Sequence, residues 1–222
     1  MSTYPIILNN RETQPVLVVG GGKIAEDKVL QLLDAGAGNV TVLSPKLGGE
    51  LVRLFAEDRF RWLARAYASG DLSKDPPFLA IAATDDPTVN RKVADEARSA
   101  RVLVNAVDDP PNCDFYAVSV VRQGSLTIGI GTDGQMPALA ARLRAKFERG
   151  FGPEYARLID IAREMRPELA RRFPDFAARR RVWYALADAP LIPMLRRGDS
   201  DAAVRAYAWN VVEQVACQRI EE

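Results

Sequence analysis

The sequence predicts an α/β fold that starts with a Rossmann-type parallel sheet, continues with a small β segment and ends in a helical carboxy-terminal domain. Three observations support this prediction. As far as Pro110, strand-like and helix-like segments alternate, which is typical of βαβ units around a parallel sheet. Two β-like stretches joined by a short link follow. From Pro137 onward, nearly every segment has a helical pattern.

The strands expected in the sheet are short, rich in apolar or β-branched residues, and bounded by breakers. They cover residues 15–19, 40–43, 60–63, 78–83 and 102–106, and the helices between them cover 23–33, 46–55 and 87–100. The β segment has expected strands at 115–121 and 125–130, linked by Arg122, Gln123 and Gly124. Breaks in the helical part are expected at 150–153, at 173–174 and around 190–193. We therefore predict three domains, 1–111, 112–150 and 151–222.

The composition, with 48% hydrophobic and 27% charged residues in 222, is that of an ordinary globular protein. Its formal net charge of +1 gives no indication of a nucleic-acid partner. The charge is uneven, because residues 138–182 hold 12 basic and 6 acidic side chains. A basic segment in a near-neutral chain favours an anionic small molecule over a nucleic acid.

The sequence contains no histidine, so it lacks the usual imidazole base and the commonest metal ligand. Proton transfer is therefore expected from carboxylates, lysines or tyrosines, and no metal site is predicted. Cys113 and Cys217 have no metal or redox spacing, which favours a reducing cytoplasm. No apolar run approaches the ~20 residues that cross a bilayer, and the first residues lack a signal-peptide pattern. We expect a cytoplasmic protein without membrane contact.

A glycine-rich turn follows the first strand. Gly20-Gly21-Gly22-Lys23-Ile24-Ala25 matches the dinucleotide fingerprint G-x-G-x-x-G/A, with Ala25 in the third small position. The first glycine permits a tight turn, the second lets the backbone approach a pyrophosphate, and the helix amino terminus favours its phosphates. Because the turn joins a buried strand to an amphipathic helix, we predict a nicotinamide dinucleotide at Gly20, Gly22, Lys23 and Ile24 rather than a merely structural turn.

Two further strand ends supply cofactor candidates. The acid that usually ends the second strand and bonds the adenosine ribose is replaced by Ser44-Pro45-Lys46. Ser44 is a candidate for a ribose hydroxyl, and Lys46 is either a partner for the 2′-phosphate of NADP or a solvated lysine. We predict NAD, although this end leaves NADP open. Thr84 and Asp85 end the fourth strand, where ligands of open α/β sheets collect, and Asp85-Asp86-Pro87 equally suits a helix N-cap.

Four motifs occur in order and at fitting distances. They are Gly20-Gly21-Gly22-Lys23-Ile24-Ala25-x-x-Lys28, Ala80-Ile81-Ala82-Ala83-Thr84-Asp85-Asp86-x-x-x-Asn90, Val104-Asn105-Ala106-Val107-Asp108-Asp109-Pro110 and Cys113-Asp114-Phe115. Together they resemble the precorrin-2 dehydrogenase module of siroheme synthase, and the similarity continues through residues 137–144. The resemblance implies NAD-dependent oxidation of precorrin-2 to sirohydrochlorin, on the path to siroheme or cobalamin.

The resemblance also implies a homodimer built through the middle β segment, 112–150, with the helical domain covering the tetrapyrrole cleft. The family aspartate associated with dehydrogenation, and with the iron insertion that some members perform, maps onto Asp108. Where the family has a Ser/Thr-rich turn, this chain has Gly131-Thr132-Asp133-Gly134, and Val118 stands where a proline is common. Without histidine, metal insertion has no imidazole to take the pyrrole protons, so chelatase (lyase) activity stays open. No methyltransferase domain follows, so methylation is expected from another protein.

The candidate residues have chemical roles that fit this reaction. Asp108 follows the fifth strand near the expected nicotinamide, where a carboxylate accepts a proton if burial raises its pKa toward neutrality. It also stabilises positive charge as a hydride leaves, unless it is simply a turn residue. Asn105 either holds cofactor amide or sugar groups or braces the loop.

The substrate carries eight carboxylates, so its site is expected to be rich in hydrogen-bond donors. Arg142 is the first candidate because guanidinium geometry matches carboxylates, with Thr132 and Gly134 as further contacts. A solvated helix face is the alternative for each arginine. We expect Arg179-Arg180-Arg181 to be solvated. Helical core positions, rather than a wall that stacks on the macrocycle, are expected for Trp183, Tyr184, Tyr207 and Trp209.

Two other functions use the same scaffold. A non-catalytic NAD(H)-sensing module would need the Rossmann domain but not Asp108. A hydroxy-acid or sugar dehydrogenase needs a base matched to an alcohol, commonly His or a Tyr-Lys pair, and neither is evident. We therefore predict an enzyme, an NAD-dependent precorrin-2 dehydrogenase.

Overall fold

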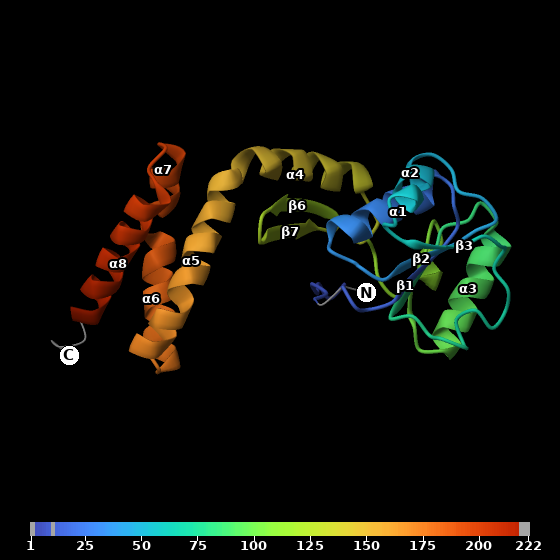
Figure 1. The fold of residues 1–222 in the computed structure, drawn as a ribbon, viewed down its shortest axis with the longest axis horizontal. Coiled ribbons are helices and arrows are strands. Elements are labelled where there is room, and N and C mark those ends of the chain that lie inside the picture. Colours follow the sequence, from blue (N-terminus) through green and yellow to red (C-terminus); the bar gives the residue numbers. More distant parts are fainter. Residues whose placement is uncertain (1–2, 10–11, 218–222) are drawn as a thin grey trace. The chain divides into compact units, whose positions relative to one another are not determined.

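The computed structural model describes residues 3–9 and 12–217. The chain forms two compact units, residues 1–117 and 118–222 (Figure 1). The first unit contains a parallel sheet with its helices, and the second contains an antiparallel strand pair and five helices in its described part. The predicted fold class is confirmed. A boundary at residue 150, within the second unit, stays a prediction.

The sheet of the first unit has five parallel strands in the order β3-β2-β1-β4-β5. Their bounds are β1 (Val16–Val19), β2 (Val40–Leu43), β3 (Arg61–Leu63), β4 (Leu79–Ala82) and β5 (Leu103–Ala106). All five predicted strands are confirmed. The chain winds outward from β1 to β3 and then returns to the other side of β1, so the strand order reverses between β1 and β4. In open α/β sheets, ligands bind beyond the carboxyl ends of the strands at such a reversal.

Helices cover both faces of this sheet. They are α1 (Lys23–Asp34), α2 (Glu50–Ala56) and α3 (Pro87–Ser99). Val16 and Val18 pack in one apolar cluster with residues of α1 and α2, whereas Leu17 and Val19 pack in the other with residues of α3. This alternation explains why β1 is apolar at every position, as a strand buried on both faces must be.

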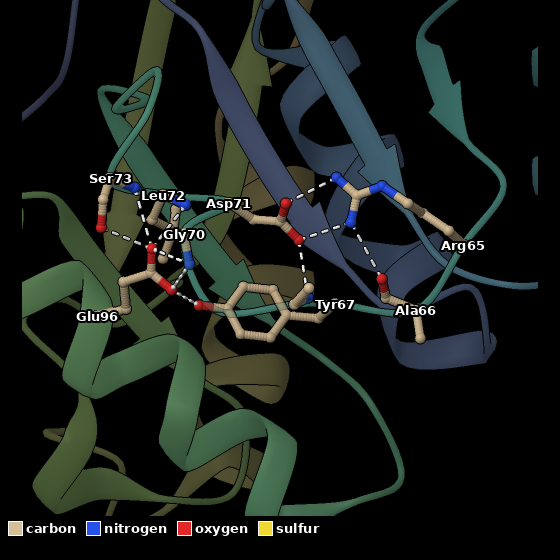
Figure 2. A network of polar contacts seen from close by, with 9 residues as sticks. Arg65, Ala66, Tyr67, Gly70, Asp71, Leu72, Ser73 and Glu96 are labelled. Atoms are coloured by element: carbon tan, nitrogen blue, oxygen red, sulfur yellow. Dashed lines mark hydrogen bonds and ion pairs between the residues drawn. The ribbon is translucent and has the colours of Figure 1, made fainter.

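The connection from β3 to β4 contains no helix, and residues 64–78 pack on the sheet in its place. Leu72 is fully buried and Tyr67 packs against the same cluster as α3. The loop is held by Glu96 of α3, which accepts hydrogen bonds from the N–H groups of Gly70, Leu72 and Ser73. It also accepts hydrogen bonds from the hydroxyl groups of Tyr67 and Ser73 (Figure 2). One carboxylate thus fixes a connection that a helix usually makes.

The second unit begins with a hairpin of β6 (Ser119–Gln123) and β7 (Leu126–Ile130). Gly124 is the first of the two residues in the hairpin turn, and its φ is +55°. The favoured two-residue hairpin turns require a positive φ at this position. Five helices follow in the described residues: α4 (Pro137–Gly150), α5 (Pro153–Arg172), α6 (Phe176–Asp188), α7 (Leu191–Arg196) and α8 (Asp201–Cys217). The hairpin packs on α4, and α5 to α8 share one apolar core. Within the described ranges, none of the helices combines the length and apolar character of a membrane span.

Several predicted boundaries are wrong. The helix expected at 46–55 begins only at Glu50, because Gly48 and Gly49 (φ +51°) belong to a loop. The strand expected at 115–121 begins at Ser119, and the predicted link is shifted, since Arg122 and Gln123 belong to β6. The break between α7 and α8, where Gly198 has φ +94°, was not predicted. The three predicted helix breaks are confirmed.

Candidate functional site

The glycine turn after β1 is tightly packed at two positions and open at the third. A methyl group built on Gly20, which has φ +126°, would lie 2.3 Å from the carbonyl oxygen of Ala83. One built on Gly21 would lie 2.0 Å from the carbonyl oxygen of Lys46, whereas no described atom lies within 4 Å of one on Gly22. Packing therefore requires Gly20 and Gly21, while Gly22 leaves space at the amino-terminal end of α1. This is the position at which the dinucleotide fingerprint places a pyrophosphate.

The loop after β2 is bonded to the glycine turn. The N–H of Gly48 donates to the carbonyl oxygen of Gly21 at 2.9 Å. Ser44 is 3% exposed, and its hydroxyl donates to the carbonyl oxygen of Lys46 at 2.6 Å. The hydroxyl hydrogen is thus used within the loop, and only its lone pairs are available to a ribose hydroxyl. Pro45 and Lys46 are exposed. The cofactor roles of Ser44, Pro45 and Lys46 stay predictions.

Glu26 of α1 is a buried carboxylate that the sequence analysis missed. It accepts the N–H of Glu50 at 2.7 Å, and its other oxygen lies 2.5 Å from Nζ of Lys23. The Lys23 ammonium and then the Glu50 N–H hold the pKa of Glu26 below its usual range. In return, the carboxylates of Glu26 and then Asp27 raise the pKa of Lys23, whose exposed ammonium is ion-paired with both beside the glycine turn. An acid next to Ala25 on the buried face of α1 was the available signal.

Asn90 of α3 organises the turn after β4. Its Oδ1 accepts both the N–H of Thr84 at 3.1 Å and the Thr84 hydroxyl at 2.7 Å, and its Nδ2 donates to the Thr84 carbonyl oxygen at 3.0 Å. Asp86 is the N-cap of α3, where it accepts the N–H of Thr88 at 2.8 Å. The N-cap alternative for Asp85-Asp86-Pro87 is thus confirmed at Asp86, whereas Asp85 is exposed. The motif is therefore first a structural clamp, and cofactor roles for Thr84 and Asp85 stay predictions.

Asp108 lies at the tip of a loop that is fixed on both sides. Asn105, 7% exposed, donates to the carbonyl oxygen of Phe115 at 2.8 Å. The N–H and one carboxylate oxygen of Asp114 bond the backbone of Val104 at 2.7 and 3.0 Å. The Cys-Asp-Phe motif thus runs beside β5 and holds both ends of the loop. The bracing alternative for Asn105 is confirmed, and its cofactor role stays a prediction.

Asp108 itself combines a strained backbone with a free side chain. Its φ of +60° lies in the left-handed region that residues other than glycine rarely adopt. The side chain is exposed and forms no hydrogen bond or ion pair with any residue of 3–9 or 12–217. The burial that was named as the condition for proton transfer is therefore not provided by the described residues. Asp58, Arg101 and Asp133 also have positive φ, so it is the accessible carboxylate at the sheet edge that keeps Asp108 as the candidate for proton transfer.

The predicted substrate residues belong to the second unit. Arg142 is exposed on α4, Thr132 accepts the N–H of Met136 through Oγ1 at 3.3 Å, and Gly134 has φ +73°. Their contact with substrate stays a prediction.

Among the aromatic residues and arginines of the helices, some predicted surroundings are confirmed and others are wrong. Trp183 and Trp209 pack against the core as predicted, but Tyr184 and Tyr207 are 60% and 39% exposed, so their core assignment is wrong. The solvated assignment of Arg179 is also wrong, because it is half-buried and donates to the carbonyl oxygen of Phe173 at 2.8 Å.

Comparison with known proteins agrees with the two units. A model of an NAD(P)-binding family matches residues 7–119, and that of the sirohaem synthase dimerisation region matches residues 154–208. The siroheme synthase of Methylobacillus flagellatus is 39% identical over 206 residues, 93% of this chain and 43% of the relative. Siroheme synthase 1 of Cronobacter sakazakii is 40% identical over 190 residues, 86% of this chain and 40% of the relative. The chain thus spans less than half the length of these curated relatives.

A solved structure shares the fold. SirC, a precorrin-2 dehydrogenase, superposes with a TM-score of 0.71 at 21% identity, covering 96% of this chain and 99% of SirC.

Proposed function

We propose that this chain, which belongs to the NAD(P)-binding family matched over residues 7–119, is an NAD-dependent dehydrogenase that oxidises precorrin-2 to sirohydrochlorin. One observation carries the proposal: the open Gly22 and the unpartnered Asp108 lie at the same edge of the sheet. Val19, Ala82 and Ala106 are register partners across β1, β4 and β5. The segments that follow these three strands therefore emerge side by side.

The residues at this edge fit a dinucleotide. The space beside Gly22 and the amino-terminal end of α1 admits a pyrophosphate, because no side chain caps the helix there. The Lys23 ammonium beside this space is ion-paired with Glu26 and Asp27, so the attraction for phosphates comes from the open amino-terminal end of α1. Lys46 is exposed where most NAD enzymes have an acid, so the chain does not repel a 2′-phosphate. NAD is the proposed cofactor, with NADP as the alternative to be measured.

The reaction removes one hydride and one proton from the macrocycle. Bound NAD supplies the hydride acceptor at nicotinamide C4. Asp108 accepts the proton on its carboxylate and later releases it to solvent. The fixed loop holds this carboxylate at the sheet edge. Covering by the substrate removes water from around it, which strengthens its interaction with positive charge that develops as the hydride leaves.

The substrate is a polycarboxylate, and α4 carries a matching face. Arg142, Lys146 and Arg149 are exposed, and none forms an ion pair with a described residue. Residues at this spacing share one helix face and cover about 10 Å along the axis at a rise of 1.5 Å per residue. The opposite side of the helix packs against the hairpin through Ala140, Leu143 and Phe147. We call the three exposed cations the α4 stripe and assign them to substrate carboxylates.

The assembly is proposed to be a homodimer. The match to a dimerisation region supports it and falls on residues 154–208, in the helices from α5 onward. A contribution from 112–150 stays a prediction. Both cysteines are free, which supports a reducing cytoplasm as the location. Metal insertion is not part of this proposal.

An anaerobic assay of the purified chain with precorrin-2 and either NAD or NADP tests the proposal. We expect reduced cofactor and sirohydrochlorin to form in equal amounts. Gly22→Val serves as the control, because it fills the open position without a packing clash and should remove cofactor binding and turnover together. Cofactor binding by calorimetry without any turnover would instead support the NAD(H)-sensing alternative and overturn the enzyme.

A further inference from the structure

The loop that carries Asp108 is joined to α3 by four polar side chains. Nη2 of Arg98 donates to Oδ1 of Asn112 at 2.7 Å, and Nδ2 of Asn112 donates to Oδ2 of Asp109 at 2.6 Å. The same Asp109 oxygen lies 3.7 Å from Nη2 of Arg91. Arg91 and Arg98 are seven residues apart and therefore share a face of α3. Asn112, at the centre, is 6% exposed.

These contacts begin immediately after the strained residue. The N–H of Asp109 donates to Ala106 at 3.2 Å, and the N–H of Asn112 donates to Asp109 at 2.9 Å. Arg98 also reaches the carbonyl oxygen of Pro111 at 3.1 Å. Left-handed backbone at a residue other than glycine persists only where its surroundings impose it. The side chains that fix residues 109–112 adjoin Asp108 directly and are therefore placed to hold its backbone.

We propose that Asn112, anchored by Arg98, is a positioning residue that holds the Asp108 carboxylate where it takes the proton. This inference rests on the proposed function. The role requires an amide, because Asn112 accepts from a guanidinium through one atom and donates to a carboxylate through the other. A carboxylate at position 112 would accept from Arg98 but would face Asp109 with like charge.

The donor and acceptor roles can be exchanged. Asn112→Asp alone should lower kcat about tenfold to hundredfold, since small misplacements of reacting groups have effects of this size, while the KM for NAD stays unchanged. Asp109→Asn alone should cause a smaller loss. The double variant pairs an amide donor at 109 with a carboxylate acceptor at 112, and it should recover most of kcat. Asp95→Asn is the matched control, because it removes an exposed partner of Arg98 at 3.4 Å without touching the loop.

A merely structural role would lower the melting temperature and the NAD affinity with kcat, whereas a positioning role lowers kcat at unchanged NAD affinity. The proposal would be overturned if the kcat of Asn112→Asp equals that of the wild type. It would also be overturned if the kcat of the double variant is as low as that of Asn112→Asp. If Asn112→Asp does not fold, Arg98→Gln takes its place, with the same kcat loss expected and an unchanged kcat overturning the proposal.

If the wild-type chain shows no turnover, the proposed function is overturned but the role of Asn112 is not yet tested. Amide hydrogen exchange then measures whether Asn112 holds the loop. The amides of Asn112 and Cys113 donate to Asp109 and Pro110. Their protection should fall in Asn112→Asp and return in the double variant. Exchange that is the same in all variants would overturn the holding role of Asn112.

Discussion

Glu96 and Asp108 are carboxylates in the same unit with opposite surroundings. Glu96 accepts hydrogen bonds from two hydroxyl groups and three backbone N–H groups (Figure 2). Partial burial acts to raise the pKa of Glu96, but the bonds from Tyr67, Ser73 and the backbone together hold it below its usual value. Asp108 has an exposed side chain, no partner in the described chain and a left-handed backbone. The first carboxylate is used to hold the fold, and the second is available to a substrate.

The largest effect expected from this contrast is on catalysis at Asp108. Asp108→Asn should lower kcat by a factor of about 10² to 10⁴, the usual contribution of general acid–base catalysis. The fold should persist, because asparagine tolerates left-handed backbone and no native partner is lost. Initial rates and a thermal melt measure the two effects. A rate within a few-fold of the wild type would remove Asp108 from the mechanism and end the contrast.

Glu96→Gln should do the reverse and destabilise the fold without slowing the reaction. A neutral amide offers one acceptor oxygen where the carboxylate offers two, so backbone N–H groups lose partners. The free energy of unfolding at neutral pH should fall by about 2 kcal/mol. Denaturant unfolding measures it, with the exposed Asp95→Asn on the same helix as a control of near-zero effect.

The effect of Glu96→Gln on the free energy of unfolding should depend on pH in a direction that the pKa of Glu96 defines. Because folding lowers the pKa of Glu96, its contribution to stability is present above the ordinary value of 4.5 and is lost as the pH falls through the folded-state pKa. The difference in unfolding free energy between wild type and Glu96→Gln should therefore narrow below that pH. A difference that stays constant into the acid range would show that the charge of Glu96 is not what the loop uses.

The same residues show what sequence patterns reveal. The run at β1 and the glycine turn were predictable, because hydrophobic periodicity and a local motif report neighbours along the chain. The distant partners of Glu26 and Glu96 were not, since Glu50 and Gly70 lie 24 and 26 positions away. The close approach of Gly21 to the carbonyl oxygen of Lys46, which leaves no room for a side chain, was not predictable from the motif. Polar contacts between distant segments leave no periodic signal.

The cations of α4 show the same contrast between charged side chains that have a partner in the described chain and those that have none. Arg144 pairs with Glu148 at 2.6 Å, whereas the α4 stripe has no acidic partner in the described ranges. Arg142→Gln should weaken binding of an octacarboxylate porphyrin by up to about fivefold, the scale of one exposed charge pair. Arg144→Gln is the matched control and should leave binding unchanged. Fluorescence titration measures the binding. If both variants lose the same affinity, the porphyrin is attracted by the charge of the whole helix and not by the α4 stripe.

The smallest expected effect concerns the backbone strain at Asp108. Glycine adopts the left-handed conformation freely, so Asp108→Gly relieves a cost of about 1–2 kcal/mol, but it also gives the unfolded chain more freedom, which offsets part of the gain. The free energy of unfolding should rise by up to about 1 kcal/mol while turnover is lost. Asp58, exposed with φ +53°, is the matched control, since Asp58→Gly should bring a similar gain with full activity. If both variants gain stability and only Asp108→Gly loses turnover, the strain is general and the chemistry belongs to one carboxylate. If Asp108→Gly is destabilised, the side chain holds its loop, and Asp108 resembles Glu96 more than the contrast allows.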